Sequence, residues 1–210
     1  MIKPPSDSTD TWNVTAWRSR AKSLLTQRFS EPAAQLFVAG GLNPNKVTIA
    51  GGFLSLGAGY LASRGHLTGA GALVVASGAL DLVDGTLARL TGRKTRFGAV
   101  LDSTIDRLGE AAVLFGLLAL YSGLGDTSKV LLVFATMVGS VLTSYIKARA
   151  EGVGIECNVG ILTRGERVVI MALGLLLGQV PAALWTLALL SYVTAGQRLL
   201  QVKRAAGEEQ

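Results

Sequence analysis

The chain has 210 residues, half of them hydrophobic, and its mean hydropathy of +0.44 is high for a soluble protein. Its 26 glycines lack the three-residue period of collagen, and its single cysteine excludes an internal disulfide. The net charge of +6 is compatible with a nucleic-acid ligand, but the basic residues lie mainly between apolar segments. This distribution favours a membrane protein, and no nucleic-acid partner is expected.

The first residues are polar, and we expect residues 1–14 to be disordered, as well as residues 205–210 at the other end. Between about 15 and 41, apolar and basic side chains alternate: Trp17, Arg18, Arg20, Lys22, Leu24, Leu25, Arg28 and Phe29. This mixture predicts an amphipathic juxtamembrane helix that lies on the membrane surface, with an ordinary solvated helix as the alternative.

Six apolar stretches follow, separated by short polar breaks: 46–63, 67–90, 98–122, 128–150, 166–179 and 181–201. Most of them approach the ~20 residues that an α-helix needs to cross a bilayer. The fifth is short, and Pro181 separates it from the sixth. The sequence therefore predicts an all-α integral membrane protein. Residues 15–204 would form one membrane domain, with six transmembrane helices over about 45–204.

The basic residues indicate the orientation of these helices. Six crossings place both termini on the same side of the membrane, together with the loops at 91–97 and 151–165. All but two of the 20 Lys and Arg residues fall on or near this side, and the exceptions are Arg64 and Lys129. Because positive residues are concentrated in cytoplasmic loops, the pattern predicts a multi-pass protein of the cell membrane with cytoplasmic N- and C-termini.

Four aspartates interrupt the second and third apolar stretches. Asp81 and Asp84 are three residues apart, so both lie on one face of a helix. Asp102 and Asp106 are four residues apart and share a face for the same reason. The loop at 91–97 turns the chain back. We therefore expect the two helices to be antiparallel neighbours, with the four carboxylates meeting near their cytoplasmic ends.

Carboxylates at membrane depth need compensating cations, because an ionised group there costs at least ~2.5 kcal/mol. Hard divalent cations take oxygen ligands, and paired carboxylates suit Mg²⁺ bound to a substrate phosphate. Small residues at positions 85, 88 and 98 leave room for such a bound group. The alternative is ion pairing with the basic residues of the same stretch: Arg89, Arg93, Lys94, Arg96 and Arg107.

A second group of polar residues concerns the other substrate. Lys147 lies near the end of the fourth apolar stretch, Arg198 lies in the sixth, and Arg164 and Arg167 stand at the start of the fifth. The predicted topology places all four toward the cytoplasmic side, where the aspartates are. They predict one cationic pocket for an acceptor that already carries a phosphate, since Arg binds phosphate in a fork. The alternative is that they are positive-inside anchors at helix ends.

The pattern D-x2-D-G-x2-A-R-x8-G-x3-D-x3-D is matched at every fixed position: Asp81, Asp84, Gly85, Ala88, Arg89, Gly98, Asp102 and Asp106. On these residues the chain resembles the CDP-alcohol phosphotransferases. The resemblance implies an integral membrane enzyme with six transmembrane helices, usually a homodimer. Such enzymes transfer a phosphate-linked group from a CDP-alcohol to a second alcohol and release CMP.

The resemblance also implies roles for individual residues. Asp81, Asp84 and Asp102 would bind metal, and Asp106 would be the catalytic base and also face the metals. The expected cofactor is Mg²⁺, with Mn²⁺ as the alternative, in a site for two ions. The residues expected to contact the CDP-lipid are Asp81, Gly85, Ala88, Arg89 and Gly98, with Asn45 and Thr48 from the segment LNPNKVT.

The combination TRFGAVLDSTIDR, SYIKARAE, RGER and QR looks most like the phosphatidylinositol phosphate synthases of actinobacteria and their archaeal relatives, over roughly residues 40–200. In that group the equivalent basic residues bind inositol phosphate, here Lys147, Arg164, Arg167 and Arg198. The resemblance implies transfer of the phosphatidyl group from CDP-diacylglycerol to inositol phosphate at the cytoplasmic side of the membrane.

Two other functions stay open. Phosphatidylglycerophosphate synthases share the aspartate signature and would use glycerol 3-phosphate as the acceptor. An ion-coupled membrane transporter is the alternative from another class, because intramembrane acids can carry ions. A transporter is expected to have sites near the midplane and broken helices in both halves of the chain. The four aspartates instead cluster on one pair of helices near one face.

Overall fold

The structure, a computed structural model, describes residues 30–207, and every regular element in this range is a helix. In chain order the helices are α2 (Glu31–Ala39), α3 (Pro44–Ser63), α4 (Leu67–Leu90), α5 (Arg96–Gly123), α6 (Thr127–Gly152), α7 (Arg164–Leu176) and α8 (Val180–Gly207). The prediction of an all-α fold is therefore confirmed for the described residues.

Helices α3 to α8 coincide, within a few residues, with the six apolar stretches. Of these, α4 and α6 are both long enough and apolar enough to cross a bilayer. Helix α8 continues to Gly207, past the domain end predicted at residue 204. The segment 1–14 and most of the predicted amphipathic helix lie outside the described residues, and α2 covers the last part of that helix.

Capping residues in the loops set where the helices begin. The Asn43 side chain accepts a hydrogen bond from the backbone N–H of Asn45 (3.1 Å) at the start of α3. Thr95 accepts one from the N–H of Gly98 (2.9 Å) at the start of α5. Such bonds satisfy donors that have no partner inside the helix. Between α4 and α5, Gly92 has a φ of 65°, which lets the chain reverse and brings the acidic ends of both helices to the same end of the molecule.

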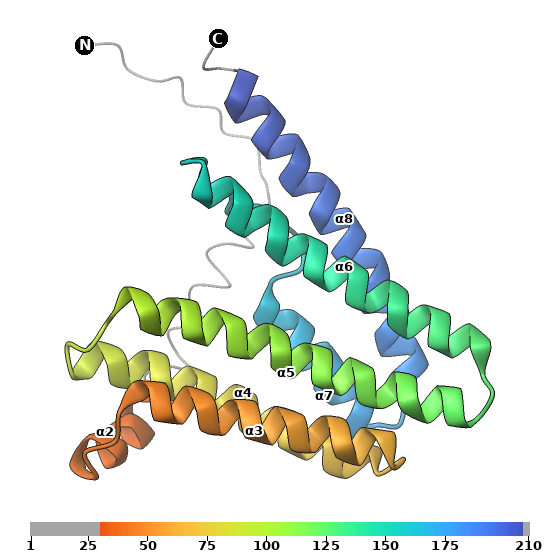
Figure 1. Cartoon of the computed structure of the whole chain (residues 1–210), viewed down its shortest axis with the longest axis horizontal. Coiled ribbons are helices and arrows are strands. Elements are labelled where there is room, and N and C mark those ends of the chain that lie inside the picture. The colour runs from red at the N-terminus through yellow and green to blue at the C-terminus, as the bar shows by residue number, and fades with distance from the viewer. Residues whose placement is uncertain (1–29, 208–210) are drawn as a thin grey trace.

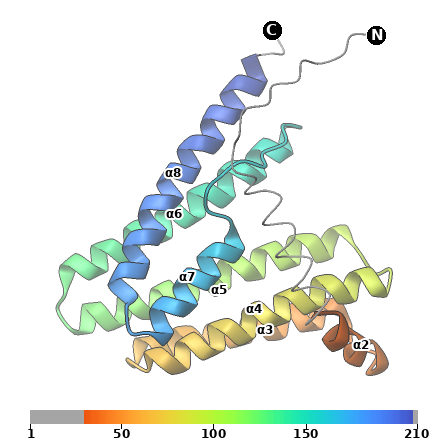
Figure 2. The same cartoon turned by 180° about the vertical axis from the view of Figure 1, so that it is seen from behind.

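The helices form two groups that diverge toward one end of the molecule (Figure 1). Helix α3 packs against both α4 and α5 in one group, and α6 packs against α8 in the other. The short α7 contacts α4 and α8 and is seen between the groups in the view from behind (Figure 2). The short connections α3–α4, α5–α6 and α7–α8 gather at the opposite end (Figure 1). The polar ends of α4, α5 and α7 therefore face one another where the groups separate.

The expectation that the helices carrying the aspartates are direct neighbours is wrong. Helix α3 packs extensively against both α4 and α5, whereas α4 and α5 hardly touch each other. The antiparallel pair is thus spread apart by α3. As a result, the carboxylates of α4 and α5 face each other although the two helices are not packed together.

An apolar core joins the helices beyond the polar end. Its fully buried members include Leu114 and Leu117 of α5, Val133 of α6, Leu175 of α7 and Leu184 of α8. The outer faces carry exposed large side chains, among them Phe53, Phe115, Trp185 and Tyr192. Exposed apolar surface of this extent is typical of a protein that faces lipid.

A close contact between two glycines holds α3 against α5. A Cβ added at Gly116 would lie 2.0 Å from the carbonyl oxygen of Gly59, which leaves no room for a side chain. Gly116→Ala is expected to destabilise the protein by about 1–3 kcal/mol, because overpacking forces the backbone to shift. Gly123→Ala, in the same helix, is the matched control, since a Cβ there meets nothing within 4 Å. Thermal unfolding in detergent compares the two, and equal stability would contradict the close contact.

Candidate active site

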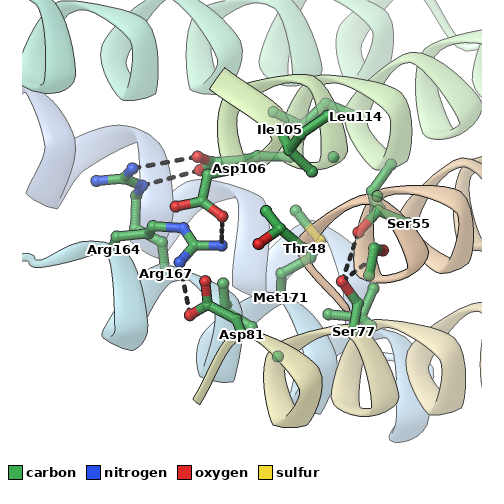
Figure 3. A pocket seen from close by; sticks show the side chains of 18 of the residues that line it. Thr48, Ser55, Ser77, Asp81, Ile105, Asp106, Leu114, Arg164, Arg167 and Met171 are labelled. Carbon is green, nitrogen blue, oxygen red and sulfur yellow. Dashed lines mark hydrogen bonds and ion pairs between the residues drawn. The ribbon is translucent and has the colours of Figure 1, made fainter. Parts of the chain in front are cut away.

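One pocket collects polar side chains from five helices, α3 to α7, and several of them are drawn in Figure 3. Its polar lining includes Thr48 from α3, Asp81 and Asp84 from α4, Asp106 and Glu110 from α5, and Arg164 and Arg167 from α7. Glycines of α3, α4 and α5 line it as well, and side chains of neighbouring helices pack closely against them: a Cβ added at Gly52 would lie 2.8 Å from Ile105, and one added at Gly109 would lie 2.8 Å from Ser55. The fold thus brings the predicted acidic and basic groups to one place.

Three of the four aspartates form a compact group. One oxygen from each of Asp81, Asp102 and Asp106 lies within 4.8 Å of the other two. Asp102 Oδ1 is buried and has no hydrogen-bond partner among the described residues. Divalent cations prefer oxygen ligands, and two ligands on opposite sides of Mg²⁺ are roughly 4 Å apart. The spacing of the carboxylates and the unpartnered oxygen of Asp102 therefore fit a divalent cation.

Asp84 lies outside this compact group. Its side chain is 6% exposed, and its carboxylate accepts a hydrogen bond from Thr48 Oγ1 at 2.6 Å. Because Thr48 belongs to the first turns of α3, this bond ties α3 to the acidic end of α4. The role of Asp84 as a metal ligand stays a prediction, and Thr48 is the group that orients its carboxylate.

Arg164 is the main cationic partner of the compact group. Its Nη1 lies 2.8 Å from Asp81 Oδ2, and its Nη2 contacts Asp106 Oδ1 (Figure 3). Of the five basic residues considered above as ion-pair partners, Arg107 alone pairs with an aspartate within residues 30–207, at 3.7 Å from Asp106. Ion pairing is thus present, but an arginine that was predicted to bind the acceptor phosphate provides most of it.

Arg167 and Arg198 meet at one turn of α6. Arg167 is 4% exposed and donates Nε and Nη2 to the two carboxylate oxygens of Glu110, at 2.8 and 3.1 Å. Its Nη1 lies 3.4 Å from Thr143 Oγ1. Arg198 is also buried and donates Nη1 to the carbonyl oxygen of Thr143 and Nε to that of Val159. Thr143 therefore joins two of the predicted phosphate-binding arginines.

The structure separates the four predicted phosphate ligands into two pairs. Arg164 and Arg167 line the pocket, and Lys147 and Arg198 do not. Lys147 lies one helical turn beyond Thr143 on α6 and is 3.6 Å from Glu151. Arg167 and Arg198 thus meet at Thr143, but of the four predicted phosphate ligands only the α7 arginines contact carboxylates of the pocket.

The residues expected to contact the CDP-lipid lie at the polar ends of α3, α4 and α5. A Cβ added at Gly98 would be 3.2 Å from Asn45 Oδ1, so the first turns of α3 and α5 touch there. A Cβ added at Gly85 would meet nothing within 4 Å, whereas Ala88 is half-buried and Arg89 is exposed. The space beside Gly85 is compatible with a bound group, as the small residues of this stretch predict.

The sequence alone does not single out two polar residues of this region, Glu110 and Thr143. Glu110 follows Asp106 by four residues and so continues the acidic face that begins at Asp102, a spacing that could have identified it. Thr143 carries no such signal, because its contacts arise only where α6 passes α7 and α8.

Comparison with known proteins agrees with this site. Residues 42–197 match the family model described as CDP-alcohol phosphatidyltransferase. The phosphatidylinositol phosphate synthase of Mycolicibacterium smegmatis is 41% identical over 192 residues, which covers 86% of this chain and 86% of the relative. The archaetidylinositol phosphate synthase of Pyrococcus horikoshii is 38% identical over 165 residues, which covers 78% of this chain and 85% of the relative.

Solved structures give the same result. The phosphatidylinositol phosphate synthase of Mycobacterium tuberculosis with CDP-DAG bound has a TM-score of 0.76 at 35% identity, over 83% of this chain and 94% of that chain. The same synthase in complex with manganese and citrate has a TM-score of 0.75 at 35% identity, over 82% and 88% of the two chains. These matches confirm the resemblance inferred from the aspartate pattern. The chain belongs to the CDP-alcohol phosphatidyltransferase family.

Proposed function

We propose that the protein transfers the phosphatidyl group of CDP-diacylglycerol to inositol phosphate, which gives phosphatidylinositol phosphate and CMP. The observation that carries this proposal is that Asp81 and Asp106 line the same pocket as Arg164 and Arg167, with Arg164 in contact with both carboxylates. The carboxylates suit a metal-bound pyrophosphate, and the arginines suit a second substrate that carries a phosphate. The relatives described above support the choice of acceptor, since their names are those of inositol phosphate lipid synthases.

A divalent cation is the cofactor that this site suits. Asp81, Asp102 and Asp106 would hold it, with Asp84 as the fourth predicted ligand. When bound, the ion neutralises the pyrophosphate and stabilises the departing CMP. We propose Mg²⁺ as the native ion, Mn²⁺ as a substitute and two ions per site, because four carboxylates at membrane depth require more positive charge than Arg164 supplies. The manganese in a related structure supports a divalent ion.

Asp106 is the proposed general base. Its side chain is 9% exposed and lines the pocket, and Arg164 contacts its Oδ1 and fixes the orientation of the carboxylate. From this position Asp106 would take the proton of the acceptor hydroxyl as that hydroxyl attacks the lipid phosphate. The basic residues would hold the phosphate that the acceptor already carries, and the surrounding apolar core would exclude water from the reaction.

A screen of acceptors tests the proposed function. Purified protein is mixed with labelled CDP-diacylglycerol, Mg²⁺ or Mn²⁺ and one alcohol at a time, and CMP release is measured. Inositol phosphate is expected to be used, and free inositol to be a poor acceptor because it cannot bind the arginines. A preference for glycerol 3-phosphate would make the protein a phosphatidylglycerophosphate synthase. If no alcohol caused CMP release, the transferase reaction would be refuted, and the ion-coupled transporter would be the function to test next.

We also propose that helices α3 to α8 all cross the cell membrane, with both termini and the site on the cytoplasmic side. The even number of helices, the positive charge at the polar end and the gathering of the short connections at the other end support this topology. The N-terminal segment would form the amphipathic helix on the membrane surface. Homodimer formation, which the family resemblance implies, is part of the same proposal.

Cysteine labelling tests the topology. Cysteines at His66 and Ser128 are expected to react with an impermeant thiol reagent in sealed cells, because both positions are exposed near the short connections. A cysteine at Lys94, between α4 and α5, is expected to react only after the membrane is opened. The native Cys157 is buried and should give little background. Labelling at Lys94 alone in sealed cells would reverse the proposed orientation.

A further inference from the structure

Glu110 lines the pocket, although the reaction described above gives it no role. It lies one helical turn after Asp106 on α5, and its side chain is 21% exposed. Both of its carboxylate oxygens accept hydrogen bonds from Arg167, from Nε at 2.8 Å and from Nη2 at 3.1 Å. Two parallel bonds of this kind make an Arg–carboxylate pair strong and fix its direction.

This pair determines which edge of Arg167 can meet a substrate. A guanidinium binds an anion in a fork through two adjacent N–H groups. Because Glu110 occupies the Nε/Nη2 edge, a phosphate can bind that edge only by displacing Glu110. Within residues 30–207, the Nη1 group has one long contact, of 3.4 Å with Thr143 Oγ1, and that hydroxyl donates its own proton to the carbonyl oxygen of Ser140 at 2.8 Å.

The Nη1 group of Arg167 faces the region where other basic residues lie. Arg198 donates to the carbonyl oxygen of Thr143, and Lys147 follows Thr143 by one turn of α6. Positive charge from α6, α7 and α8 therefore gathers around this turn of α6, next to the pocket that Arg167 lines. The Nε/Nη2 edge of Arg167, in contrast, is bonded to the carboxylate of Glu110.

We propose that Glu110 is a positioning residue for the acceptor: it holds Arg167 by the Nε/Nη2 edge so that Nη1 is presented to the acceptor phosphate. This inference rests on the proposed function for the class of acceptor, a phosphorylated alcohol. If the Glu110–Arg167 pair only stabilised the fold, removing Glu110 would have a different effect, because loss of one partner of a buried ion pair destabilises the whole protein. In that case the binding of both substrates would suffer.

The kinetics of Glu110→Gln in the full-length protein test the proposal. Gln keeps the size of the side chain but loses its charge and one of the two acceptor oxygens. The KM for inositol phosphate is expected to rise about tenfold, which corresponds to ~1.4 kcal/mol of lost binding. The KM for CDP-diacylglycerol and kcat should stay within about twofold of wild type, because only ground-state and transition-state binding of the acceptor is weakened. Glu156→Gln, an exposed carboxylate in the loop before α7, is the matched control and should behave as wild type.

A double-mutant cycle gives the decisive readout. If Glu110 acts through Arg167, the variant with both Glu110→Gln and Arg167→Gln should have the same acceptor KM as Arg167→Gln alone. Additive effects would overturn the proposal, and so would a proportional rise of both substrate KM values in Glu110→Gln. Should Glu110→Gln fail to fold, Glu110→Asp decides, since it keeps the charge but withdraws the carboxylate by one methylene. A raised acceptor KM with an unchanged KM for CDP-diacylglycerol supports the positioning role, and any other result with this variant refutes it.

A wrong assignment of the overall function would be detected independently of Glu110, by measuring CMP release with the wild-type protein. In that case inositol phosphate would not cause CMP release at all. If glycerol 3-phosphate is the acceptor instead, the same cycle is measured with that compound, because the argument concerns the phosphate and not the alcohol.

Discussion

Asp106→Asn is expected to lower turnover by roughly 10²–10⁴-fold, the range that follows the loss of a general base. Asn has the same shape as Asp but cannot take the proton of the acceptor hydroxyl. Asp106 is placed for this role, because it lines the pocket beside Arg164 and lies within the compact group of carboxylates. The measurement is CMP release at saturating CDP-diacylglycerol and inositol phosphate.

Measuring the binding of CDP-diacylglycerol distinguishes a variant that has lost the proton-transfer step from one that has lost the metal and nucleotide site. Asp106→Asn should retain most of its binding of CDP-diacylglycerol, whereas Asp81→Asn should also weaken metal-dependent binding of the nucleotide. Asp126→Asn is the control: Asp126 caps α6 outside the pocket, and Asn caps a helix as well as Asp does. Near-normal turnover of Asp106→Asn would show that another group is the base.

Much of the fold follows from the sequence because apolar length and helix periodicity are local properties. The apolar run from 67 to 90 predicts α4 at its observed limits, and the polar break near 64–66 predicts where α3 ends. The spacing of Asp102 and Asp106 likewise places both on one face of α5. These conclusions need only the geometry of a single helix.

The arrangement of the helices could not be predicted in the same way. Helix α3 packs closely against α5 where Gly59 and Gly116 allow two backbones to meet, and nothing in a chain with 26 glycines marks this pair in advance. Residues distant in sequence pose the same problem. Arg164 and Asp81 are far apart along the chain, and their contact depends on where α7 lies against α4.

Arg164 has two partners: the carboxylates of the metal site, which it contacts in the structure, and the acceptor phosphate, which it is proposed to bind. In the structure its guanidinium contacts the Asp81 and Asp106 carboxylates, which are also predicted metal ligands. A guanidinium and a divalent cation compete for these oxygens, since both are attracted to the same negative charge. Arg164 is also a proposed contact of the acceptor phosphate. Its removal should therefore affect the metal and the acceptor differently.

Arg164→Gln is expected to shift two measured quantities in opposite directions. The KM for inositol phosphate should rise about ten- to hundredfold, because a hydrogen bond to a charged group contributes about 1.5–3 kcal/mol. The Mg²⁺ concentration needed for half-maximal CMP release should fall, because the competing cation at Asp81 and Asp106 is gone. Arg149→Gln, an exposed arginine in the last turn of α6, is the matched control and should change neither quantity. A higher Mg²⁺ requirement in Arg164→Gln would mean that the arginine holds the carboxylates in place for the metal, and an unchanged KM for inositol phosphate would remove Arg164 from the acceptor pocket.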